Sequence, residues 1–231
     1  LDARKQEAFF SGDFGTVRIG QGADSGDGTI NGDLSGTAVT QPVASLALAH
    51  GYSNRDYNGF DPARGERLRY DSPEIAGSLT LSAQLEEEDK KEIAFKYSKK
   101  LSGGHQIRAG GFLYDTAADD QDTNAFLVSF LLKQGFNITV ATGSKDNAAG
   151  ATLDGEFDSV KLGYKTGKHA VSIITGTSKN ARNAVETDAT GIAYVHKLDK
   201  GIELYASMQE FDASDNTKDE DITLVGTRIK F

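Results

Sequence analysis

The chain of 231 residues contains no cysteine, a single methionine and only three prolines. Without cysteine it has no disulfide, no thiolate metal site and no cysteine nucleophile. It also lacks any run of about 20 apolar residues, the length that a membrane-spanning helix needs. The formal net charge of −9 argues against a nucleic-acid partner, for which a basic patch is the expected signature.

What is present favours β-structure: 26 glycines and repeated alternation of apolar with polar side chains. The segment 221–231 is typical, because Ile229, Thr227 and Val225 fall on one face of a strand while Lys230 and Arg228 fall on the other. A membrane barrel agrees with the 38% hydrophobic content, since every second residue of its strands faces the lumen. The sequence therefore predicts an all-β, antiparallel, up-and-down transmembrane barrel.

The alternation predicts about thirteen strands within a single domain, 1–231. They are expected at 3–12, 14–21, 65–71, 77–86, 91–100, 105–114, 123–133, 136–144, 157–165, 168–178, 189–198, 201–211 and 221–231. The apolar set is expected to face lipid or a neighbouring subunit: Leu79, Leu81, Phe95, Val160, Leu162, Ile202 and Leu204.

The connections alternate in length. Tight turns marked by glycine or proline, such as "GDFG" and "LDKG", alternate with polar or acidic loops, of which the segment 22–64 is the longest. In outer-membrane barrels the short turns lie at the periplasm and the long loops outside. A soluble all-β domain remains the alternative.

Four stretches resemble the general porins of Gram-negative outer membranes. "FGTVRIG" (14–20), a long loop and "ERLRYDSPEIAGSLTLSAQ" (66–84) are similar to the family's strand, constriction loop and next strand. "YVHKLDKGIELYAS" (194–207) resembles the penultimate hairpin and "VGTRIKF" the closing strand. The order and spacing of these stretches match the family over nearly the whole chain.

This resemblance implies a sixteen-stranded barrel, of which the chain begins at the fourth strand, so that the domain is expected to be N-terminally incomplete. The alternative is a smaller barrel whose strand count differs by one. The resemblance further implies a bacterial outer-membrane location, a homotrimer that contacts lipid and lipopolysaccharide, and a water-filled channel for passive diffusion of ions and small hydrophilic solutes.

In the resembling family the third external loop folds into the barrel, where its acidic groups face basic residues of the wall. This implies a constriction at 22–64, with Asp56, Asp61 and the apolar stretch 43–49 in the same loop. Alternation places four arginines on the strand faces opposite to the apolar side chains. These faces are expected to point inward, because a lipid-facing charge costs about 2–4 kcal/mol at the midplane. The expected constriction residues are Asp24, Asp27, Asp33, Arg18, Arg67, Arg69 and Arg108. Alternatively, the loop is a mobile surface loop, and the arginines could also simply brace the wall.

No enzyme, cofactor or metal site is expected. The four histidines lie in loops, turns or strand ends, and neither "GxSxG" nor "HExxH" occurs. Acidic loops such as "DNTKDED" could hold Ca²⁺, although their spacing is not that of an EF-hand. An outer-membrane phospholipase or protease barrel, or a surface β-domain that binds partners through its loops, remains an open alternative.

Overall fold

The computed structural model describes residues 5–43, 64–116, 121–146, 154–179, 185–214 and 219–230. Thirteen strands form one sheet. The strands are β1 (Gln6–Gly12), β2 (Gly15–Gly22), β3 (Gly65–Asp71), β4 (Leu79–Glu86), β5 (Lys90–Lys100), β6 (Gln106–Thr116), β7 (Gln121–Leu131), β8 (Phe136–Lys145), β9 (Gly155–Thr166), β10 (His169–Lys179), β11 (Glu186–Asp199), β12 (Ile202–Ala213) and β13 (Glu220–Ile229). A short 3-10 turn, η2 (Glu87–Asp89), connects β4 to β5.

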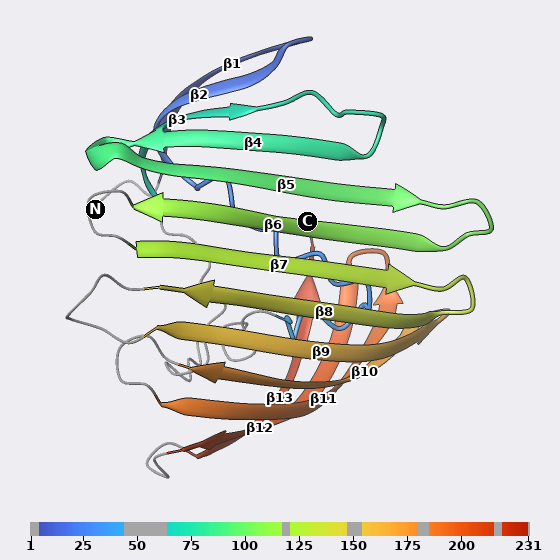
Figure 1. Ribbon diagram of the computed structural model, residues 1–231. Helices are drawn as coiled ribbons and strands as arrows, with labels where there is room; N and C mark the ends of the chain where they lie inside the picture. Colours follow the sequence, from blue (N-terminus) through green and yellow to red (C-terminus); the bar gives the residue numbers. More distant parts are fainter. Residues whose placement is uncertain are drawn as a thin grey trace.

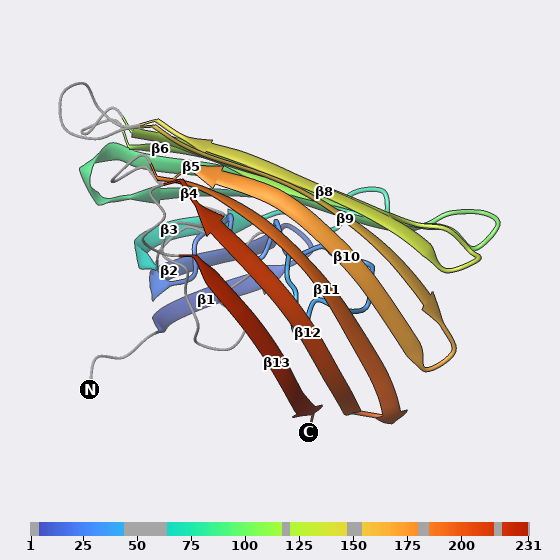
Figure 2. The same cartoon turned by 90° about the horizontal axis from the view of Figure 1, so that it is seen from below.

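Each strand pairs antiparallel with the next along the chain, from β1 to β13 (Figure 1). This confirms the predicted up-and-down order and all thirteen strands. Among the described residues, β1 and β13 each have one neighbouring strand, so the sheet is an open trough (Figure 2). In this part of the chain, no helix combines the length and the hydropathy that crossing a bilayer requires.

The convex face of the trough is apolar. All seven side chains that the alternation assigned to lipid lie on this face, and Leu81, Leu162 and Leu204 are exposed there. A contiguous apolar surface of this extent is costly in water and marks contact with lipid or protein. Period-2 alternation therefore positioned the outer wall correctly.

The concave face is not uniformly polar. It carries a buried apolar cluster that includes Phe112, Phe157 and Phe211 from the wall, together with Ile30 and Val43 from the segment after β2. The phenyl rings of this cluster are buried together with side chains of that segment. Burial of one such side chain contributes about 1.5–3 kcal/mol, so the cluster holds the segment against the wall.

Candidate pore constriction

Residues 23–43, which we call the inner loop, lie inside the trough and cross most of its width (Figure 2). At the start, the backbone N–H of Ser25 donates to Gln84 Oε1 on β4 at 2.7 Å. At the end, the hydroxyls of Thr40 and Ser207 on β12 lie 2.6 Å apart. Because its polar groups bond to strands far apart in the sheet, the inner loop is a built part of the concave wall.

The central anchor of the inner loop is a buried ion pair. Lys161 Nζ on β9 lies 2.7 Å from Asp33 Oδ2, and the two side chains are 0% and 2% exposed. Lys161 also donates to the backbone carbonyl of Gln41, and Asp33 accepts from the Ser35 N–H at 2.7 Å. Two separate turns of the loop thus meet at one lysine.

Glycine permits the loop to approach the wall closely. A Cβ atom at Gly110 on β6 would collide with the backbone carbonyl of Thr29, and one at Gly163 on β9 would lie 2.9 Å from Ser35 Cβ. A side chain at either position would push the loop backbone away, because the obstructing atoms are not flexible side-chain ends.

Three of the predicted arginines form one network on β2 and β3. Arg18 bonds to Glu7 at 2.9 Å and to Asp71 at 3.2 Å, and Arg69 bonds to Asp71 at 2.7 Å. Arg67 bonds to Glu7 at 3.0 Å, with 1% of its side chain exposed. Two carboxylates therefore offset most of the charge of three guanidinium groups, and Arg67 is withdrawn from the lumen.

Arg108 lies apart from this network, exposed on the concave face of β6, with its Cβ beside Gly32 of the inner loop. Lys165 on β9 interacts electrostatically with both Arg108 and Lys197 on β11. We call Arg108, Lys165 and Lys197 the basic wall. The two lysines are not among the constriction residues predicted from the sequence, although the alternation with Val160 and Leu162 places Lys165 on the inward face.

The predicted loop carboxylates occupy three different environments. Asp33 is paired with Lys161, whereas the Asp24 side chain is buried near Gln84 and Glu86. Asp27 is half-buried, and its backbone carbonyl accepts from Lys96 Nζ at 2.8 Å. Asp56, Asp61 and the stretch 44–49 lie outside the described residues.

Burial raises the pKa of Asp24 to about 7, and the nearby charge of Glu86 acts in the same direction. Within the described part of the chain, Asp24 Oδ1 has no hydrogen-bond partner, and the neighbouring Glu92 on β5 is equally buried. The first turn of the inner loop therefore contains a buried carboxyl group whose neutral form is favoured.

This pKa predicts that the protein loses stability as pH rises from about 4 to 7. In that window the folded state retains a proton on Asp24 that the unfolded chain, with the ordinary value of 3.8, has released. Asp24→Asn should therefore match the parent near pH 4 and exceed its unfolding midpoint above pH 7. Midpoints measured by circular dichroism across this range test the prediction, and parallel curves for the two proteins would contradict it.

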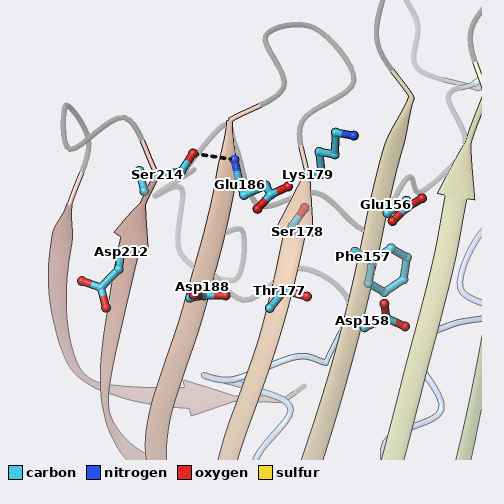
Figure 3. A pocket seen from close by; sticks show the side chains of 11 residues that line it. Glu156, Phe157, Asp158, Thr177, Ser178, Lys179, Glu186, Asp188, Asp212 and Ser214 are labelled. Carbon is cyan, nitrogen blue, oxygen red and sulfur yellow. Dashed lines mark hydrogen bonds between the residues drawn. The ribbon is translucent and has the colours of Figure 1, made fainter.

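The rim at the long-loop end of β9–β12 is acidic. A pocket of about 400 Å³ there is lined by five carboxylates and one lysine (Figure 3): Glu156, Asp158, Glu186, Asp188, Asp212 and Lys179. The backbone N–H of Glu186 donates to Ser214 Oγ at 3.0 Å and fixes the edge of this pocket. The rim is negative, whereas the basic wall deeper in the trough is positive.

A sheet with an apolar convex face and an inward-folded, wall-anchored loop defines a β-barrel channel protein. The sequence model of the Gram-negative porin family matches residues 1–216. The chain belongs to this family. A search of curated protein sequences finds no match.

Solved structures of outer-membrane proteins share the fold. The anion-selective porin from Comamonas acidovorans superposes with a TM-score of 0.59 at 13% identity, covering 97% of this chain and 77% of that one. OmpT, an outer membrane protein of Vibrio cholerae, gives 0.57 at 12% identity, with coverages of 98% and 79%. A mutant of the Rh. blastica porin gives 0.56 at 17% identity, with coverages of 94% and 73%. The protein is an outer-membrane porin whose channel serves passive diffusion.

Proposed function

We propose that ions and small hydrophilic solutes pass between the inner loop and the arginine-bearing wall, and that the side chains predicted from the sequence surround the narrowest section. One observation carries this proposal: the inner loop is hydrogen-bonded across the concave face from β4 to β12. A segment fixed there narrows the lumen permanently. The residues concerned are Asp24, Asp27, Asp33, Arg18, Arg67, Arg69 and Arg108.

We further propose that the channel prefers small anions. The carboxylates of the constriction are mostly buried or paired, whereas Arg108 and Lys197 are exposed on the concave face. Charges in the lumen act on a passing ion at short range, while the acidic rim is screened beyond a Debye length of about 8 Å at physiological salt. The electrostatic potential that a permeating ion meets in the lumen is therefore positive, although the total charge of the chain is negative.

Conductance in a planar bilayer tests this function. The folded protein is expected to give stepwise, voltage-independent currents at low voltage. Under a KCl gradient, its reversal potential should have the sign for chloride preference. A potassium-selective reversal potential would mean that the acidic groups, not the basic wall, dominate the pore. Absence of any current steps would contradict the channel itself.

We also propose a homotrimer and no enzymatic activity. The convex face of β2 and β3 presents Ile19, Leu68 and Tyr70 in exposed positions, a surface suited to subunit contact. Mass measurement in mild detergent tests the assembly, with only monomers as the contrary result. Passive diffusion needs no catalytic group, and lipase or protease turnover by the purified protein would overturn the second proposal.

A further inference from the structure

Two histidines and a tyrosine converge on the convex face of β10 and β11, at the end of these strands where the tight β9–β10 and β11–β12 turns lie. His169 and His196 are direct cross-strand partners. Their Nδ1 atoms lie 3.3 Å apart, and the Tyr194 hydroxyl lies 2.6 Å from His169 Nδ1. Three atoms that can donate an electron pair thus surround one small volume.

Protons alone satisfy this arrangement poorly. A neutral imidazole nitrogen offers either one lone pair or one N–H, so His169 Nδ1 can make only one well-aligned bond. Two partners nevertheless compete for it: the hydroxyl of Tyr194 and the Nδ1 of His196. A cation held between the three atoms would use all three electron pairs at once.

The spacing of the two imidazoles fits a divalent transition metal, and the Tyr194 hydroxyl, which lies at hydrogen-bond distance from His169 Nδ1, would have to move outward by several tenths of an ångström to join them. Two ligands on one tetrahedral Zn²⁺, each about 2.0–2.1 Å from the metal, are separated by about 3.3–3.4 Å. The imidazole pair already has this separation. We propose that His169, His196 and Tyr194 form a binding site for a borderline divalent metal ion of the Zn²⁺ class, with water as the fourth ligand.

The site lies on the last cross-strand row before the β9–β10 turn, a row that also includes Leu204 on the convex face. His169 is exposed and His196 is half-buried, directly beside the turn that links β9 to β10. Together with Tyr194 they line one end of a pocket of about 500 Å³. Lys168 in that turn directs its ammonium group to the Leu198 carbonyl at 2.8 Å. The charge of Lys168 is thus held by its own backbone partner.

Binding requires no redox step. Each imidazole supplies its Nδ1 lone pair and keeps its proton on Nε2. The phenol of Tyr194 coordinates either as the neutral oxygen or, after releasing one proton to water, as phenolate. The bound ion would join β10 to β11 at the edge of the barrel, independently of conduction through the lumen.

Zinc titration of the untagged, detergent-folded protein at neutral pH tests the site. Calorimetry should show one Zn²⁺ per chain in the micromolar range. His169→Ala and His196→Ala should each weaken binding at least about tenfold, and Tyr194→Phe should weaken it less. His105→Ala is the matched control, because His105 lies at the same end of the barrel but bonds to the Lys133 N–H, and this variant should bind as the parent does.

A second measurement keeps the inference testable if a variant folds poorly. Cu²⁺ bound to the parent should show two imidazole nitrogens by electron paramagnetic resonance, and each folded single variant should show one. Equal zinc affinity in the parent and both alanine variants, or no binding by the parent, would overturn the site. Neither result would bear on the channel function, which bilayer currents measure separately.

Discussion

Lys161→Met is expected to release the inner loop from the wall and to raise single-channel conductance. Lys161 and Asp33 are both fully buried, and the lysine also holds the Gln41 carbonyl. Removal of one partner of a buried ion pair leaves an uncompensated charge, at a cost of about 3–5 kcal/mol. The chain can escape this cost by moving Asp33 into water, which detaches the loop. Conductance steps in a planar bilayer provide the measurement.

A second substitution separates loop release from general damage. Asp33→Asn combined with Lys161→Met removes both charges, and its conductance should return towards the parent value because no unpaired charge remains. Lys179→Met is the matched control, since Lys179 lines the acidic rim and makes no contact with Gln41 among the contacts described. Equal conductance of the parent and Lys161→Met would mean that other anchors, such as Thr40 with Ser207, suffice to hold the loop.

The strands could be predicted from sequence because lipid outside and water or loop inside impose a strict period of two. Val160 and Leu162 against Lys161 and Lys165 is a pattern that no helix produces. Alternation gave the face of each side chain, and all four predicted arginines do point to the concave side. The same rule could not say which inward side chains meet water, because that depends on where the inner loop lies.

The constriction shows this limit at particular residues. Arg67 and Arg108 have the same sequence signature, yet Arg67 is buried against Glu7 while Arg108 is exposed. Glu7 belongs to β1 and reaches Arg67 on β3 across β2, a partnership that no local pattern indicates. Phe112 likewise alternates onto the concave face, and only the overlying loop makes an apolar residue favourable there.

These burial differences decide which arginine sets selectivity. Removing Arg67 would leave Glu7 with fewer cationic partners inside the wall, which affects stability more than permeation. Arg108 and Lys197 of the basic wall, in contrast, are exposed on the concave face. Selectivity should therefore follow Arg108, Lys165 and Lys197.

Replacing all three residues of the basic wall with glutamine is expected to shift the reversal potential strongly towards cations. A unit charge about 4 Å from a passing ion contributes about 1 kcal/mol even at the dielectric constant of water, so three such charges change the permeability ratio several-fold or more. The barrel should remain folded, because inward side chains add little to the lipid-facing burial. Reversal potentials under a KCl gradient, with heat-modifiable mobility on gels as the folding check, measure the effect.

Two controls define what the shift means. Lys179→Gln removes the same charge from the acidic rim, outside the lumen, and should leave the reversal potential nearly unchanged because salt screens the rim. Glu7→Gln combined with Arg67→Met neutralises a buried pair and should also leave it unchanged. A triple variant with the parent's reversal potential would show that permeating ions do not pass the basic wall. If only the Glu7 and Arg67 double variant shifts the reversal potential, the permeating ions pass along β1–β3. The reason is that ions respond only to charges that they approach within about a Debye length.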